Sequence, residues 1–280
     1  MPVPPFMRPR IHRHGEHEGP WIEDAFERYF STLAPLSLSR TYIPLRWTDY
    51  YWRYEFLPHQ ELQDFVDLML EPEKPYFTVL QSFHGIQQEL PNDVLVFAAG
   101  GPGGVPIPLI RKDLEYSFEP SKEYKVTFQG DFGTTRKRTV DVRRLMHEKL
   151  AGRKDFHFLN PDSPENYYTA LAKSEFVLCP RGAGPTSFRL HESLSLGAIP
   201  IYIWEDVEWL PYREELDWSQ LIVSINYRHI DELPGIIEAM PPDEIALKQK
   251  YIREHHKEYF SLNGVCRYIL RSLDQEEHRR

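Results

Sequence analysis

Residues 168–218 read YTALAKSEFVLCPRGAGPTSFRLHESLSLGAIPIYIWEDVEWLPYREELDW and decide the fold. The pattern predicts a helix, a strand, a turn, a second helix and a second strand, in that order. The first strand ends at Cys179 and Pro180, and a glycine-rich loop enters the next helix at about Thr186 or Ser187. In open α/β sheets, ligands bind beyond the carboxyl ends of the strands, where helix amino termini offer free N–H groups to anions. We therefore expect this turn to hold a phosphate or a sugar.

Four side chains in this turn and helix suit such a ligand. Arg181 and Arg189 can each offer a planar fork of N–H donors to a diphosphate. Ser187 could cap the helix or bond to a phosphate oxygen. Glu192 lies about one turn beyond Arg189 on the same helix face, where its carboxylate could accept both hydroxyls of a ribose. The alternative for Arg189 and Glu192 is an ordinary surface ion pair, which contributes well under ~1 kcal/mol.

The composition favours a folded protein that does not bind nucleic acid. The 280 residues are 41% hydrophobic and 14% aromatic, which is ample for a packed core. The formal net charge is −9, whereas nucleic-acid binding needs clustered positive charge. Cys179 and Cys266 lie in apolar segments and are expected to be buried thiols, with a disulfide as the alternative. We find neither a signal-peptide core nor a run of ~18 apolar residues, so the expected location is cytoplasmic or otherwise soluble in a host cell, without a membrane span.

Strands that alternate with helices predict an α/β fold with parallel sheets. Helices are predicted over residues 21–33, 59–70, 139–150 and 163–174, after Thr186 or Ser187, and after Pro242. Strands are predicted over residues 41–47, 76–83, 93–101, 125–130, 157–160, 176–180, 198–204 and 221–226. A polar, turn-rich segment at 113–122 marks a domain boundary. The predicted organisation is a loose arm over 1–19, one half over 20–115, a second half over 122–242, and helices over 243–280 that pack across or back on the first half.

Short motifs follow one another in a fixed order along the second half. They are Cys179-Pro180, Arg181-Gly182, Ser187 with Arg189 and Glu192, Gly197-Ala198-Ile199-Pro200, Asp206, Leu210-Pro211-Tyr212 and Asp217-Trp218. Upstream, the strand KVTFQG is followed by Arg136 and by Val142-Arg143. This order resembles the exostosin family of glycosyltransferases over about residues 105–240, and only faintly before them. A compact chain without a membrane anchor is similar to the soluble glycosyltransferases of large algal (chlorella) viruses.

The resemblance implies a GT-B architecture, with two Rossmann-like halves facing across a cleft. It implies that the half over 122–242 binds a UDP-sugar donor and that the half over 20–115 binds a glycan or glycoprotein acceptor. The implied reaction is an inverting transfer of a sugar to an acceptor hydroxyl. Xylose is the first hypothesis for that sugar, and galactose, arabinose and glucuronic acid are alternatives. Two other hypotheses are a non-catalytic glycan-binding protein of the same fold and a nucleotide-sugar epimerase, although no G-x-G-x-x-G follows an early strand.

No Asp-x-Asp pair occurs in the chain. The usual ligands for a divalent metal on the donor diphosphate are therefore missing, and neither a metal nor another cofactor is expected. Arginines and helix N–H groups would then stabilise the leaving diphosphate. The predicted donor-binding residues are Gly130, Arg136, Arg138, Arg181, Gly182, Ser187, Arg189, Glu192 and Asp206. For Arg136 and Arg138 a solvated basic loop is an equal alternative, and Glu205 could contact the sugar in place of Asp206.

An inverting transfer also needs a general base for the acceptor hydroxyl. Many family members carry His or Asp after the strand that corresponds to DVLVF, whereas this chain has Phe97-Ala98-Ala99 there, so the base stays unassigned. The candidates are His84, Asp93, Glu73 and Asp131, with Asp49 beside them, and each has a structural role as its alternative. Trp47, Tyr50 and Trp52 could stack on an acceptor sugar, or belong to the core.

Overall fold

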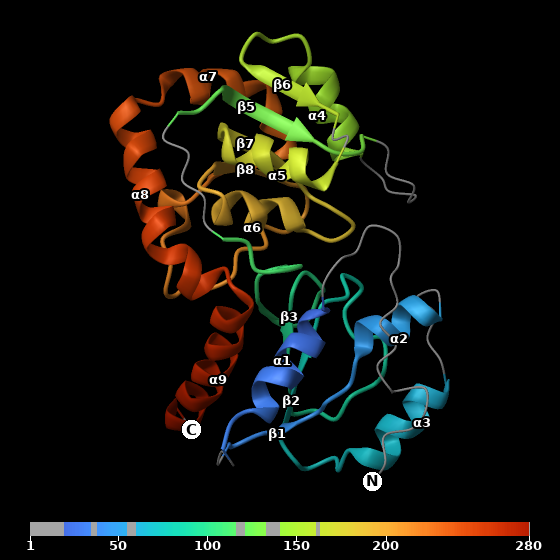
Figure 1. The fold of residues 1–280 in the computed structure, drawn as a ribbon. Coiled ribbons are helices and arrows are strands. Elements are labelled where there is room, and N and C mark those ends of the chain that lie inside the picture. The colour runs from blue at the N-terminus through green and yellow to red at the C-terminus, as the bar shows by residue number, and fades with distance from the viewer. Residues whose placement is uncertain are drawn as a thin grey trace. The chain divides into compact units, whose positions relative to one another are not determined.

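The computed structural model describes residues 20–34, 38–54, 60–115, 121–132, 141–160 and 163–279. The chain forms two compact units, one of Met1–Asp113 with Ser261–Arg280 and one of Leu114–Phe260 (Figure 1). Each unit is built on a parallel β-sheet with helices packed against it. The prediction of an α/β fold with two Rossmann-like halves is therefore confirmed.

The sheet of the first unit has the strand order β1-β2-β3-β4, and all neighbouring strands are parallel. The strands are β1 (Thr41–Tyr42), β2 (Tyr76–Leu80), β3 (Val94–Ala98) and β4 (Val105–Pro106). Every residue of β2 is buried, which agrees with the prediction of a buried strand. Because the strands are parallel, the loops that follow Leu80 and Ala98 leave the sheet at the same edge.

Four helices of the described chain belong to this unit: α1 (Ile22–Ser31), α2 (Trp47–Arg53), α3 (Gln60–Met69) and α9 (Leu262–Arg279). Helices α1 and α9 lie side by side (Figure 1). Their apolar faces share one core with the sheet, which includes Phe26, Phe77, Phe97, Val265 and Ile269. The C-terminal helices thus divide between the units, because α8 (Pro242–Tyr259) lies in the second unit and α9 in the first.

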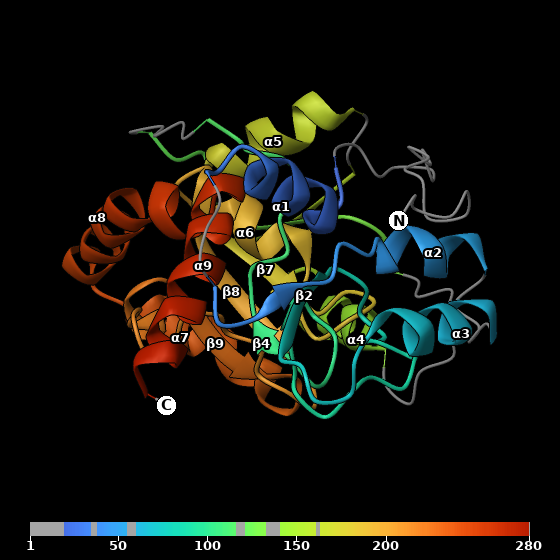
Figure 2. The ribbon, with the colours of Figure 1, turned by 90° about the horizontal axis from the view of Figure 1, so that it is seen from below.

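The sheet of the second unit has the strand order β6-β5-β7-β8-β9, again with all pairs parallel. The strands are β5 (Tyr124–Gln129), β6 (Phe156–Leu159), β7 (Ser174–Pro180), β8 (Ile199–Trp204) and β9 (Val223–Asn226). The remaining helices here are α4 (Val142–Leu150), α5 (Pro164–Ala172), α6 (Phe188–Ser195), α7 (Leu233–Ala239) and the short 3₁₀ helices η2 (Trp218–Gln220) and η3 (Tyr227–Glu232). Figure 2 shows α5 and α6 on one side of the strands and α4 and α7 on the other. The unit is therefore a doubly wound sheet.

The segment over residues 41–47 differs from its predicted structure. Only Thr41 and Tyr42 form a strand, and a helix that was not predicted begins at Trp47. Pro44 has no N–H group for a sheet hydrogen bond, so the strand cannot continue through it. Trp47, Tyr50 and Tyr51 then follow at helical spacing and are all buried, which favours a helix over a strand.

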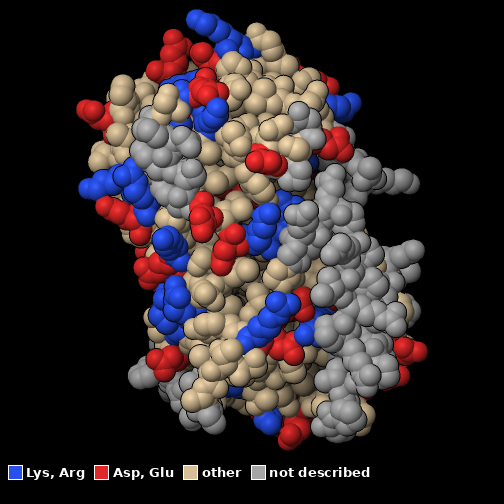
Figure 3. Space-filling model, in the orientation of Figure 1, with Lys and Arg blue, Asp and Glu red and all other residues tan. Residues whose placement is uncertain are grey.

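Three smaller features concern the cysteines, the polarity of the helices and the surface. Cys179 and Cys266 are both buried and free, which confirms the prediction of two buried thiols. None of the helices in the described part of the chain has an apolar stretch long enough to cross a membrane. On the face in Figure 3, the basic and acidic side chains of the described residues are interspersed, as is typical of a solvated surface.

Candidate functional site

The carboxyl ends of β5 and β7 form the centre of the candidate site. These neighbouring strands are paired in parallel, with Val126 opposite Phe176. From β5 the chain crosses to β6 on one side, whereas β7 continues to β8 on the other. The order of the strands thus reverses between β5 and β7. Such a topological switch point leaves a crevice beyond the strand ends, which is where open α/β sheets bind their ligands.

Arg189 of α6 lies at this switch point and is only 8% exposed. Its guanidinium carbon lies 4.5 Å from the centroid of the Phe128 ring, and its Nη2 donates to the carbonyl oxygen of Gln129. Its Nε and Nη1 are buried and have no hydrogen-bond partner among the described residues. A buried cation with unused donors is unfavourable unless a counter-charge completes it. The position therefore suits an anionic ligand.

Gly130 is what allows the arginine to approach the end of β5. Its φ is +143°, and a Cβ built on it would lie 2.5 Å from Nη2 of Arg189. Any larger residue would have to displace the guanidinium or the backbone. The predicted site residues Gly130 and Arg189 are therefore in contact.

Two hydroxyl groups precede Arg189 at the amino end of α6. Ser187 is the N-cap residue, but its side chain makes no capping hydrogen bond. The hydroxyl oxygens of Thr186 and Ser187 are buried and have no partner in the part of the chain that the structure describes. The loop before them is closed by a hydrogen bond of 2.9 Å from the Gly182 N–H to the Thr186 carbonyl oxygen. These two hydroxyls and the helix amino terminus form a second group of potential anion donors.

Arg143 of α4 is a third cation at this edge, and it was not among the predicted site residues. Its Nε donates to the Arg181 carbonyl oxygen and its Nη1 to the Asp131 carbonyl oxygen, both at 3.3 Å. Burial, together with the charge of Arg189, lowers the pKa of Arg143 to about 10. The motif Val142-Arg143 was the sequence signal for it, but only the crossover from β5 to α4 brings this side chain to the switch point.

Arg181 has a different environment from Arg189. Its Nη1 forms ion pairs with Glu205 and, at 2.9 Å, with Asp206. Both carboxylates follow β8, so the arginine connects the loop after β7 to the loop after β8. Its Nε is buried without a partner among the described residues. Arg181 therefore brings Glu205 and Asp206 to the site, which places three of the predicted residues together.

Glu192 is buried beside α5. Its carboxylate accepts a hydrogen bond of 2.7 Å from the Tyr167 hydroxyl. Burial raises the pKa of Tyr167 well above its usual value, which keeps that hydroxyl a donor. Glu192 and Arg189 are both buried, so a surface ion pair does not describe them.

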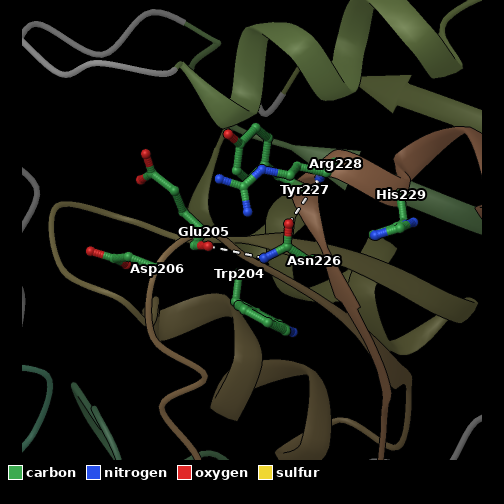
Figure 4. A pocket seen from close by; sticks show the side chains of 7 residues that line it. All are labelled: Trp204, Glu205, Asp206, Asn226, Tyr227, Arg228 and His229. Atoms are coloured by element: carbon green, nitrogen blue, oxygen red, sulfur yellow. Dashed lines mark hydrogen bonds between the residues drawn. The ribbon is translucent and has the colours of Figure 1, made fainter.

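A cavity of about 620 Å³ opens at the carboxyl ends of β8 and β9 (Figure 4). Asn226 connects two parts of the lining. Its Nδ2 donates to the Glu205 carbonyl oxygen at 2.9 Å, and its Oδ1 accepts from the Arg228 N–H at 3.1 Å. The Arg228 guanidinium lies over the Tyr227 ring, 5.1 Å from its centroid. The lining residues are Trp204, Glu205, Asp206, Asn226, Tyr227, Arg228 and His229. Carboxylates and aromatic rings in one hollow suit the hydroxyl groups and C–H faces of a sugar.

The general-base candidates lie at different places in the two units. Asp93 precedes β3 and forms an ion pair of 2.7 Å with Arg40, and Glu73 is exposed in the turn before β2. Both lie at the amino edge of their sheet, away from the edge where ligands bind. His84 follows β2 at the carboxyl edge and is exposed, and Asp131 follows β5 in the second unit.

The predicted acceptor-stacking residues are mostly in the core. Trp47 is 0% and Tyr50 is 4% exposed, and the indole Nε1 of Trp47 donates to Thr78 at 2.8 Å. Neither ring has a face open to a sugar, so both residues belong to the core, which was the alternative to stacking. Trp52 is half-buried and stacks on Trp21, with 6.4 Å between the ring centroids. Asp49 is also buried. Arg136 and Arg138 lie outside the described residues.

A solved structure with some similarity to this chain is a glycosyltransferase from Rickettsia africae ESF-5. It aligns with a TM-score of 0.43 and 11% sequence identity, over 78% of this chain and 67% of that chain.

Two plant proteins are similar to this chain in sequence. A probable glucuronosyltransferase of Oryza sativa subsp. japonica is 33% identical over 94 residues, which are 34% of this chain and 22% of that protein. The probable beta-1,4-xylosyltransferase IRX10 of Arabidopsis thaliana is 32% identical over 94 residues, which are 34% of this chain and 23% of that protein. The match thus spans less than a quarter of the length of each relative. Because these relatives are plant proteins, the similarity to viral enzymes stays a prediction.

The exostosin GT47 domain model matches residues 103–240 of the chain. This range holds the switch point, the cavity and the three arginines Arg143, Arg181 and Arg189, and it includes the motifs that resemble the exostosin family. Residues 103–240 of the chain therefore form an exostosin GT47 domain.

Proposed function

We propose that this chain is an inverting glycosyltransferase that moves a sugar from a UDP-sugar to a hydroxyl of a glycan, without a metal ion. The observation that carries the proposal is the buried guanidinium of Arg189 at the β5–β7 switch point, with Nε and Nη1 unused among the described residues. A diphosphate supplies the missing counter-charge and accepts both N–H groups. In the transition state the leaving diphosphate gains charge, so the same contacts strengthen as the bond to the sugar breaks.

We assign the rest of the nucleotide-sugar to the groups around Arg189. Thr186 and Ser187 offer hydroxyls, and the first N–H groups of α6 add to the positive end of that helix. We assign the ribose hydroxyls to Glu192, whose carboxylate also accepts a hydrogen bond from Tyr167. The cavity after β8 and β9 is the place for the transferred sugar, with Glu205 and Asp206 on its wall.

The identity of the transferred sugar is the most specific part of the proposal. The two plant relatives are named for xylosyl and glucuronosyl transfer, so both donors belong in a test panel. We keep xylose as the first candidate, with UDP-galactose, UDP-arabinose and UDP-glucuronic acid as competitors. Transfer to a glycan of a glycoprotein is the expected use.

The test is a thermal-shift titration with UDP, with and without EDTA, followed by hydrolysis of the four UDP-sugars. We expect UDP to raise the melting temperature equally in both conditions and uridine, which lacks the diphosphate, to have little effect. A shift that EDTA abolishes would refute metal independence. If UDP binds but no donor turns over, the chain is instead a non-catalytic binding protein of the same fold. The anomeric configuration of the product, read by NMR, tests inversion.

A further inference from the structure

The cavity at the ends of β8 and β9 carries opposite charges on two sides of its lining. On the side of β8, the carboxylates of Glu205 and Asp206 share one cation, because Nη1 of Arg181 pairs with both. Asp206 is also held by its own loop, since its Oδ1 accepts from the Val207 N–H at 2.9 Å. One cation against two carboxylates leaves this side acidic. Carboxylate oxygens are acceptors only, so this side suits the hydroxyl groups of a sugar.

Arg228 supplies positive charge on the side of β9. Its side chain is exposed, and its guanidinium lies over the Tyr227 ring, 5.1 Å from the ring centroid (Figure 4). Among the described residues, the Arg228 guanidinium forms no ion pair. Stacking occupies the face of a guanidinium and leaves the N–H donors of its plane for a ligand. Such a planar fork matches the two oxygens of a carboxylate, so Arg228 can bind a carboxylate in this cavity.

Asn226, the last residue of β9, fixes the backbone of Arg228 relative to the acidic side. It is the N-cap residue of η3, and its side chain accepts a hydrogen bond of 3.1 Å from the Arg228 N–H. The same side chain donates to the Glu205 carbonyl oxygen at 2.9 Å. The two strands are paired at this point, with Trp204 opposite Asn226. One amide thus connects the backbones of the acidic and the basic side, which is how a preorganised binding site is supported.

We propose that Arg228 selects donors whose sugar carries a carboxylate, so that the cavity prefers a UDP-uronic acid to the corresponding neutral UDP-hexose. The assignment rests on the proposed function. The hydroxyl groups of the sugar donate to Glu205 and Asp206, and its C6 carboxylate accepts two N–H groups of the Arg228 guanidinium. A neutral hexose has a hydroxymethyl group at C6, which offers no charge to this cation. Xylose has no C6 group, so Arg228 neither favours nor opposes it.

The test compares the affinity for UDP-glucuronic acid with the affinity for UDP-glucose, because these two donors differ only at C6. Titration calorimetry without an acceptor measures both, with UDP as the reference. We expect the wild type to bind UDP-glucuronic acid about 5- to 10-fold more tightly, the effect of one partly exposed charged contact. Arg228→Met should bring this ratio close to one and keep UDP affinity within about twofold, since the diphosphate is assigned to Arg189. Arg144→Met, which removes an exposed arginine of α4, is the matched control and should keep the wild-type ratio.

The possible results separate this assignment from the proposed function. A wild type that does not bind UDP overturns the proposed function, and the role of Arg228 with it. A wild type that binds UDP but binds the two donors equally overturns only the selection. A preference that persists in Arg228→Met also overturns it, because the carboxylate is then bound elsewhere. Weaker binding of UDP itself by Arg228→Met would place the residue at the nucleotide and refute its role at the sugar. If that variant is poorly folded, Arg228→Gln keeps a polar side chain without the charge and gives the same discrimination.

Discussion

The Arg189 guanidinium lies over the Phe128 ring, with 4.5 Å between the guanidinium carbon and the ring centroid. Stacking occupies the face of the guanidinium and leaves the N–H groups of its plane for hydrogen bonds. One of them bonds to the Gln129 carbonyl oxygen, and the buried Nε and Nη1 have no hydrogen-bond partner among the described residues. Phe128 and Gln129 belong to β5, whereas Arg189 belongs to α6 after β7. The pair therefore joins the two sides of the switch point.

Arg189→Met tests whether this cation serves ligand binding or the fold. We expect UDP affinity to fall by roughly 10- to 100-fold or more, because each hydrogen bond to a charged group contributes about 1.5–3 kcal/mol. The free energy of unfolding without UDP should be unchanged or higher, because an incompletely paired charge leaves the interior. Titration calorimetry with UDP and denaturant unfolding measure the two quantities. Arg144→Met removes an exposed arginine of α4 and should change neither. Unchanged UDP affinity in Arg189→Met would remove this residue from the site.

Gly130→Ala tests the contact between Gly130 and the Arg189 guanidinium by changing the glycine. The added methyl group meets Nη2 of Arg189 at 2.5 Å, and the φ of +143° is unfavourable for alanine. We expect a loss of stability of ~1–3 kcal/mol together with weaker UDP binding. Gly152→Ala is the matched control, since its φ is +82° but nothing lies within 4 Å of its added Cβ. It should lose some stability and bind UDP as the wild type does. Equal UDP affinity in both variants would refute the role of this contact.

The sequence identifies much of this site because its central features are local. Strands β5, β7 and β8 are buried along most of their length, and the turn before α6 is marked by its glycine and proline residues. Arg181, Arg189 and Glu192 were predicted for that reason. Arg143 was missed as a site residue because a crossover through α4 brings it to Arg181. Spacing along the chain does not report such a contact.

In the first unit, the sequence was a poorer guide to the acceptor residues, for a physical reason. Aromatic residues such as Trp47 and Tyr50 can either stack on a sugar or pack in a core. Only tertiary packing decides that these two are buried. Asp93 and Glu73, in contrast, could have been set aside from the sequence. Each precedes its strand, and a residue before a parallel strand lies at the amino edge, away from the ligand.

Glu192→Ala tests whether the Glu192 carboxylate binds the ribose hydroxyls. The wild type should bind UDP at least several-fold more tightly than 2′-deoxy-UDP, because a hydrogen bond to a carboxylate is lost without the 2′-hydroxyl. The variant should bind both nucleotides equally. Tyr167→Phe, which removes the hydroxyl that holds Glu192 at 2.7 Å, should reduce the preference only in part. Glu148→Ala, an exposed carboxylate of α4, is the control and should keep the wild-type preference. A preference that survives in Glu192→Ala places the ribose elsewhere.

Glu23 makes the stability of the chain depend on pH. Its carboxylate is buried at the start of α1, where one oxygen accepts hydrogen bonds from the N–H and the hydroxyl of Thr48. Burial raises the pKa of Glu23 from 4.5 to about 7, against the smaller opposing effect of these hydrogen bonds. Between these two values the folded chain holds a proton that the unfolded chain has released, so the free energy of unfolding falls as pH rises. The loss is complete above about pH 7 and is on the order of 3 kcal/mol, at about 1.4 kcal/mol for each unit of pKa.

Glu23→Gln should remove this dependence, because a neutral amide occupies the same volume at every pH. Denaturant unfolding gives the free energy of unfolding of the wild type and of the variant at pH 5 and at pH 8. The change in their difference between the two pH values measures the dependence. We expect the variant to gain stability relative to the wild type as the pH rises between these two values. Glu71→Gln changes an exposed carboxylate and should leave the difference near zero at both pH values. Parallel pH profiles for the wild type and Glu23→Gln would mean that the folded chain does not hold this proton. The buried carboxyl would then be charged at neutral pH, and its hydrogen bonds with Thr48 would have to outweigh the cost of its burial.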